Sequence, residues 1–135
     1  MASVNAEHVP SGEAADAAVA RLTEMSPDLR GCAVLGPQGR ALAASGDPES
    51  WANAGAALLA AADGAGEEPA SHVHVATEDG EAFAVRHEGL AMVAVAERFT
   101  LASLMIFDMR AVLRDLAKEA VDAEADGLSE LRGRD

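Results

Sequence analysis

Cysteine and aromatic residues are scarce in this chain of 135 residues. Cys32 is the only cysteine, so the chain cannot form an internal disulfide. Its setting, R-G-C-A-V-L, is typical of a strand, where a lone cysteine is a small buried hydrophobic residue and not a reactive thiol. Aromatic residues make up only 3% of the chain, and alanine supplies much of the hydrophobic content. We therefore expect a core of small side chains in thin layers.

Basic residues are also few, and the formal net charge is −13 at neutral pH. An acidic surface repels phosphate groups, which argues against nucleic acid and anionic membranes as partners. No stretch approaches the roughly 20 apolar residues that span a bilayer, so we expect no membrane insertion. No charged start followed by a long apolar run resembles a signal peptide. The sequence thus predicts a cytoplasmic protein.

The motifs of common enzymes are missing from the sequence. It contains no G-x-x-x-x-G-K-[ST] phosphate loop, and Gly64-Ala65-Gly66 follows a predicted helix, whereas a phosphate-binding glycine loop precedes one. No serine lies in a G-x-S-x-G turn. Carboxylates are plentiful, but no apolar pocket around any of them can be identified. We predict no catalytic residue, no cofactor and no enzymatic activity.

Turn residues and hydrophobic periodicity divide the chain into short elements. We expect a flexible tail over residues 1–11, a domain over 12–121 and an acidic, frayed tail over 122–135. Helices are expected from the cap Ser11 to Pro27, from Pro48 to Asp63 and after the cap Thr100, and strands over 30–36, 40–45, 72–78, 81–87 and 90–96. The buried stripe of the last helix is predicted to be Leu101, Leu104, Met105, Met109, Val112, Leu113, Leu116 and Ala120.

This order of helix, two strands, helix, three strands and helix predicts an α/β (α+β) fold. We expect one five-stranded antiparallel sheet with helices on both faces. The first and fifth strands are apolar on both faces, as central strands are, whereas the third carries polar residues, as edge strands do. The predicted spatial order of the strands is second, first, fifth, fourth, third.

The middle helix has almost no polar side. From Pro48 to Ala62 only Glu49, Ser50 and Asn53 are clearly polar. A helix on one sheet needs a single apolar stripe, so this pattern predicts a second neighbour, which we expect to be another chain. The third strand is an edge that can pair with a partner strand. Together they predict a homodimer interface, in which Gly55 allows a close helix approach, made of Trp51, Gly55, Leu58, Leu59, Ala62, His72, Val73, His74 and Val75.

Histidines in the third and fourth strands suggest a second kind of site. His72 and His74 share a strand face. If Asp79-Gly80 forms a two-residue hairpin turn, Val85 lies opposite His74 and His87 lies opposite His72. Three imidazoles could then hold zinc or nickel. No carboxylate or cysteine completes the set, so we predict no metal and interpret the group as a polar strand end.

The segment from about Leu29 to Lys118 resembles the roadblock / dynein light chain family, of the bacterial type associated with small GTPases. The resemblance rests on three stretches and on the Ala-Leu-rich helix between them. The stretches are R-G-C-A-V-L-G-P-Q-G-R-A-L-A-A-S-G, then V-H-V-A-T-E-D-G-E-A-F-A-V-R with G-L-A-M-V-A-V-A, and finally T-L-A-S-L-M-I-F-D-M-R. Profilin-like sheets share this general pattern.

The resemblance implies a small, non-catalytic dimer, joined through the middle helix and the third strand into one sheet across two chains. It also implies a regulator or scaffold of a small Ras-like GTPase, and no residue of a GTPase-binding surface is carried over from it. The alternative is a small-molecule or metal sensor that uses the patch of His72, His74 and His87 or a pocket under the sheet. An enzyme is the third possibility, and no recognisable nucleophile, base or cofactor loop favours it.

Overall fold

A computed structural model of the chain describes the backbone of residues 8–133 and the side chains of residues 8–125. The predicted flexible tail over residues 1–11 lies outside the described residues as far as residue 7. The elements in chain order are α1 (Gly12–Met25), β1 (Leu29–Leu35), a short 3-10 turn (Pro37–Gly39), β2 (Ala41–Ala44), α2 (Pro48–Gly64), β3 (His72–Ala76), β4 (Glu81–His87), β5 (Leu90–Ala96) and α3 (Ala102–Gly133).

The five strands form one antiparallel sheet in the order β2-β1-β5-β4-β3. This confirms the predicted fold class and strand order. The two strands with apolar residues on both faces, β1 and β5, lie together near the centre, and β3 is an edge. Local signals start α1 and α2 as expected, whereas α3 begins at Ala102 and the predicted cap Thr100 donates to the Glu97 carbonyl instead. Ser11 accepts a hydrogen bond from the Ala14 amide at the start of α1, and Asp47 accepts one from the Ser50 amide at the start of α2.

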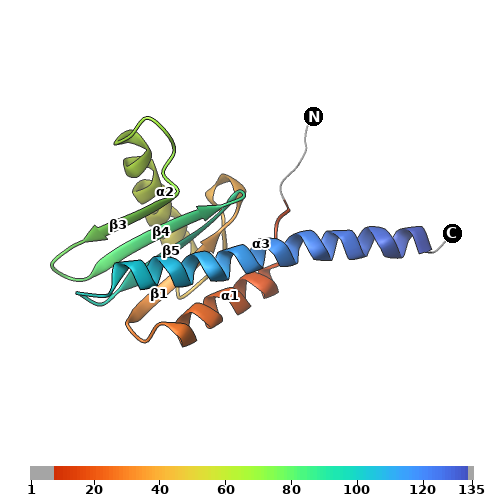
Figure 1. Ribbon diagram of the computed structural model, residues 1–135, viewed down its shortest axis with the longest axis horizontal. Coiled ribbons are helices and arrows are strands. Elements are labelled where there is room, and N and C mark those ends of the chain that lie inside the picture. The colour runs from red at the N-terminus through yellow and green to blue at the C-terminus, as the bar shows by residue number, and fades with distance from the viewer. Residues whose placement is uncertain (1–7, 134–135) are drawn as a thin grey trace.

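The helices cover the two faces of the sheet unequally (Figure 1). α1 and α3 lie side by side over one face, and α2 covers the other. The first face holds the larger buried side chains, among them Phe83, Met92 and Met109. The second face has a smaller core of short residues around Leu35, Leu59 and Val93.

The predicted pairing of β3 with β4 is wrong by two residues. His72 lies opposite Val85, and His74 lies opposite Phe83. The tight turn is centred on Glu78-Asp79, because the Thr77 amide donates to the Gly80 carbonyl at 2.8 Å and makes these two residues the closing pair. Gly80 is needed there for space and not for a left-handed turn conformation. A Cβ on Gly80 would lie 2.6 Å from the Ala96 carbonyl oxygen.

The last helix differs from its prediction at both ends. Leu101 precedes the first turn of α3 and Leu104 faces outward, so both are exposed, whereas the remaining residues of the predicted stripe are buried. Leu104 lies about 100° around the helix from Met105, on the flank away from the sheet. Falling apolar content predicted a helix end near Asp122, but α3 continues to Gly133. Seven of the twelve residues from 122 to 133 are Ala, Glu, Leu or Arg, which favour helix without needing burial.

Candidate interaction surface around the middle helix and the edge strand

The outer edge of β3 offers backbone groups to a further strand. Ser71 accepts from the Arg86 amide, and Thr77 donates to Gly80, so alternate residues from Ser71 to Thr77 bond to β4. In an antiparallel ladder the residues between them point their N–H and C=O groups the other way. The backbone groups of His72, His74 and Ala76 therefore point toward the open edge of the sheet.

Gly55 and Leu59 face the sheet of their own chain. Both are buried, and a Cβ on Gly55 would lie 2.7 Å from Leu35 Cδ1 and 3.0 Å from Val93 Cγ2. From the sequence, Gly55 was predicted to allow a close approach of a partner helix. In the structure it allows α2 to approach its own sheet closely. These two residues of the predicted interface thus belong to the core.

The opposite side of α2 carries small, uncharged side chains. Its exposed residues between the first and last turns are Asn53, Ala54, Ala56, Ala57, Ala60 and Ala61. Three residues of the predicted interface, Trp51, Leu58 and Ala62, are half-buried on the flanks of the helix. The Trp51 indole N–H donates to the Ser45 carbonyl at 2.6 Å, which fixes that ring at the start of the helix.

The β3 residues of the predicted interface divide between the two faces of the sheet. Val73 packs with the α2 core and is half-buried, and Val75, which shares its strand face, is exposed. His72 and His74 point to the other face. His74 stacks on the Phe83 ring with centroids 4.6 Å apart, and its Nε2 lies 2.5 Å from Oε1 of the buried Glu81. The open edge thus has an apolar side toward α2 and a polar side toward α3.

The three strand histidines have separate partners. Arg110 Nη2 donates to His72 Nδ1 at 2.8 Å, His74 contacts Glu81, and His87 Nε2 lies 3.7 Å from Glu88 Oε2. Among the residues whose side chains the structure describes, no group of three or more His, Cys, Asp and Glu residues is placed to hold one metal ion. The register shift that moves His87 from its predicted position opposite His72 removes the geometric basis for the histidine site.

A cleft of about 530 Å³ lies between the C-terminal half of α2 and the loops at one end of the sheet. Leu35, Leu59 and Leu90 are among the apolar residues that line it, and Asp63 and Arg86 are among the polar ones. Sequence reasoning did not find this cleft, because Asp63 and Arg86 come from distant segments and neither lies in a recognisable motif.

Asp63 and Arg86 form a two-pronged ion pair beside the cleft. Arg86 Nη1 and Nη2 donate to Asp63 Oδ1 and Oδ2 at 2.7 and 2.9 Å. Hydrogen bonds from the Arg86 guanidinium and from the Ala70 amide lower the pKa of Asp63 to about 2. Arg86 also donates to the Ala70 carbonyl, so the pair ties the end of α2 and the following loop to β4.

Cys32 is buried, as its strand setting predicted. Burial raises the pKa of its thiol to about 11, which leaves it protonated at neutral pH. Since the thiolate is the nucleophile and the metal ligand, this cysteine has a structural role. Within the described residues, no helix combines the length and apolar character needed to cross a membrane.

The fold is that of roadblock/LC7 domains. A roadblock/LC7 domain from Streptomyces avermitilis matches with a TM-score of 0.67 and 18% identity, over 78% of this chain and 97% of that one. The gliding protein MglB of Thermus thermophilus matches with 0.69 and 14%, over 89% and 99%. Myxococcus xanthus MglB matches with 0.63 and 17%, over 87% and 92%. No family model and no curated protein matches the sequence. At these identities the similarity defines the fold, which agrees with the family that the sequence resembles.

Proposed function

We propose that the protein is a non-catalytic homodimeric regulator or scaffold of a small Ras-like GTPase. The observation that carries the dimer is the position of the uncharged outer face of α2 beside the open edge of β3. The roadblock fold and the sequence resemblance are the basis for proposing a small GTPase as the partner.

Two copies would associate by joining their β3 strands. The outward backbone groups of His72, His74 and Ala76 would pair with those of the partner and extend the sheet across both chains. The exposed alanines of α2 would meet a partner helix at short range, since they carry no long side chains. Five other predicted interface residues border this contact: Trp51, Leu58 and Ala62 on α2, and Val73 and Val75 on β3. His72 and His74 would lie where the two β3 strands meet.

The dimer is tested with a charge on the outer face of α2. Ala57 is exposed there, so Ala57→Glu leaves the fold intact and places a carboxylate in the contact. We expect sedimentation velocity to show a dimer for the wild type and a monomer for Ala57→Glu. Ala20→Glu, at an exposed alanine of α1, is the matched control and should remain a dimer. A wild-type monomer at micromolar concentration, or an Ala57→Glu dimer, contradicts this interface.

The GTPase assignment is tested with any small Ras-like GTPase that is encoded near this gene. Each is loaded with GDP or with a non-hydrolysable GTP analogue and titrated with the purified protein. We expect one nucleotide state to bind at least about tenfold more tightly, a difference of about 1.4 kcal/mol. Hydrolysis of GTP by the protein alone, at an enzyme-like rate that survives repurification, contradicts the non-catalytic assignment. Absence of binding in both states contradicts the GTPase assignment.

The alternative function, a small-molecule sensor, is favoured by the cleft beside the Asp63–Arg86 pair. A cleft of this volume, with apolar walls and an arginine at its edge, falls within the size range of small-ligand sites. Native mass spectrometry of the purified protein tests this alternative directly. A stoichiometric bound mass that Leu59→Trp displaces, without loss of the folded state, would favour the sensor over the GTPase regulator.

A further inference from the structure

Four large apolar side chains are exposed in the segment where β5 passes into α3. Phe99, Leu101, Leu104 and Phe107 are exposed by 85%, 64%, 54% and 67%. Since an aromatic side chain carries about 150–250 Å² of surface, these four residues expose on the order of 500 Å². We call them the α3 patch. An apolar group of this size marks an interaction site more often than chance exposure, in which single residues are scattered.

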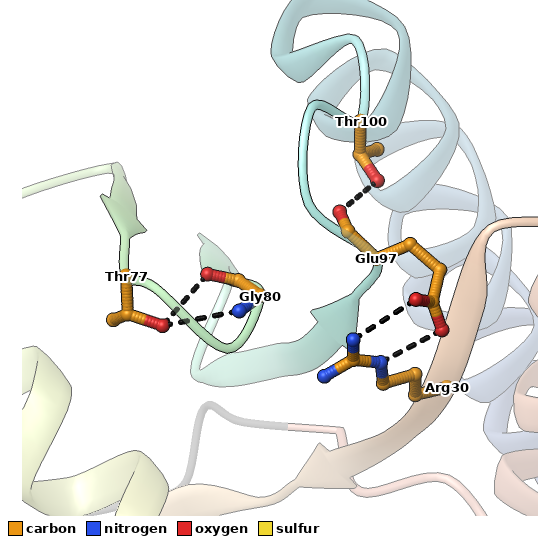
Figure 2. A network of polar contacts seen from close by, with 5 residues as sticks. All are labelled: Arg30, Thr77, Gly80, Glu97 and Thr100. Carbon is orange, nitrogen blue, oxygen red and sulfur yellow. Dashed lines mark hydrogen bonds and ion pairs between the residues drawn. The ribbon is translucent and has the colours of Figure 1, made fainter.

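The loop that carries Phe99 is held in a fixed conformation (Figure 2). Arg30 Nε and Nη2 donate to the Glu97 carboxylate at 2.8 and 2.9 Å. The Thr100 hydroxyl donates to the Glu97 carbonyl oxygen at 2.6 Å and closes the loop from the other side. Phe99 has φ of +66°, which is unfavourable for a bulky residue. The network thus maintains a strained residue whose ring faces solvent, as interaction sites do.

The α3 patch has an acidic side and a basic side. Glu81 pairs with Ala96, so the β3–β4 turn with Glu78 and Asp79 lies beside the end of β5, where α3 begins (Figure 1). Glu78, Arg98 and Phe99 line the same open hollow of about 430 Å³, and the Arg98 guanidinium lies over the Phe99 ring, 4.8 Å from its centroid. The carboxylates of Glu78 and Asp79 therefore lie beyond the N-terminus of α3, with Arg98 as the one cation among the residues that line this hollow.

The basic side lies further along the same helix. Arg110, Arg114 and Lys118 are exposed and follow Phe107 at helical spacing on the outer face of α3. The carboxylates of this part of α3 turn toward α1 instead. Asp108 accepts from the Ser26 hydroxyl at 3.4 Å, and Asp115 pairs with Arg21 at 2.7 Å. The outer side of α3 thus runs from the turn that carries Glu78 and Asp79, with Arg98 beside it, through apolar residues to basic ones.

We propose that the α3 patch binds the same patch of a second copy of this chain. A two-fold axis near Leu104 and Phe107 would set the two α3 helices antiparallel and bring each apolar group onto the other. At about 1.5 Å per residue, Arg110 and Arg114 lie roughly 5–15 Å from that axis. Arg110 and Arg114 of each chain would then face the turn with Glu78 and Asp79 of the other chain. The two-fold axis makes this contact form twice.

The predicted association is weaker than the α2–β3 dimer and separate from it. Twice the apolar area of the patch is on the order of 1,000 Å², near the lower limit for a specific interface. α2 and the α3 patch lie on opposite faces of the sheet, so both contacts can form at once. The inference does not depend on the GTPase or on the α2 interface, since the patch would pair monomers if the α2 interface failed.

The first test follows sedimentation velocity from about 1 to about 200 µM, the range where weak interfaces dissociate. We expect the wild type to show an association step that rises with concentration and is lost in Phe107→Glu. Val9→Glu, at another exposed apolar residue outside the patch, is the control and should keep the step. Ala57→Glu should also keep it while removing the tighter contact, so failure of either interface is seen separately.

The second test reverses one charge at each side of the patch. Glu78→Arg and Arg114→Glu should each weaken the association by about tenfold or less, because the pairs are exposed. An equimolar mixture of the two variants should associate again, since the basic turn of one copy then meets the acidic helix of the other. A different protein partner or a lipid surface would not give this rescue.

Three results overturn the proposal: no concentration-dependent step in the wild type, a step that Phe107→Glu leaves unchanged, or a mixture of charge variants that associates no better than either alone. Loss of binding to phosphatidylglycerol vesicles in Phe107→Glu, with sedimentation unchanged, would assign the patch to a membrane surface instead.

Discussion

The two faces of the sheet are built in different ways. Two helices and large side chains such as Phe83 and Met109 cover one face, whereas a single alanine-rich helix covers the other. A helix that is apolar all round needs two neighbours, and α2 has its own sheet on only one side. The α1/α3 face therefore holds the larger core of the single chain, while the outer side of α2 carries small side chains.

The largest effect is expected from emptying the α1/α3 face. Phe83 is fully buried between the sheet and its covering helices. Phe83→Ala should cost about 3–5 kcal/mol of unfolding free energy, because it removes buried apolar area and leaves a cavity. Urea unfolding measures the loss. Phe107→Ala removes the same side chain from the surface and should change stability by less than about 0.5 kcal/mol. Equal losses would contradict the division between a packed face and an exposed patch.

A smaller effect is expected from enlarging a contact on the α2 face. Gly55→Val places side-chain atoms where even a Cβ would lie 2.7 Å from Leu35 Cδ1. Either α2 or Leu35 must move, which should cost about 1–3 kcal/mol. Gly64→Ala is the matched control, since nothing lies within 4 Å of its added Cβ and alanine favours helix. Urea unfolding should therefore show Gly64→Ala as neutral or slightly stabilising. A neutral Gly55→Val would mean that α2 does not depend on this close approach.

The strand order could be predicted from the sequence because the polarity of whole strands decides it. β1 and β5 are apolar on both faces and β3 is not, and a sheet places such strands at the centre and the edge. The prediction of the register between β3 and β4, in contrast, depended on the role given to a single glycine, Gly80. Asp79-Gly80 is a common hairpin pair, but here Gly80 provides room for the Ala96 carbonyl, which only the folded sheet brings close.

The candidate site was harder to predict, because apolar residues look alike whether they face a core or a partner. Gly55 and Leu59 were assigned to the dimer interface and belong to the chain's own core. Leu101 and Leu104 were assigned to the core and lie on the surface. Helical spacing fixes which residues share a face, but not where the sheet meets the helix. The hydrophobic pattern therefore did not predict that apolar residues of α3 are exposed.

The smallest effect is expected at the polar contact that ties α2 to the sheet. The Arg86 guanidinium and the Ala70 amide hold the pKa of Asp63 at about 2, below the ordinary value of 3.8. A carboxyl whose pKa is lower in the folded state stabilises that state above its ordinary pKa and loses this contribution as the pH falls through the folded value. The contribution should therefore be complete at neutral pH, decline below about pH 4 and be lost as the pH falls below about 2.

Hydrogen exchange of backbone amides measures this loss region by region. Between pH 5 and about pH 2.5, the end of α2 should lose protection, after correction for intrinsic rates, before the buried half of α3 does. The reason is that Asp63 holds the α2 end through an ion pair, whereas Met109 and Leu113 hold α3 through apolar burial that does not titrate. In Asp63→Asn the α2 end should already be less protected at neutral pH and should change little on acidification. If α2 and α3 lose protection together, the two faces form one cooperative unit, and the ion pair does not set the acid sensitivity of α2.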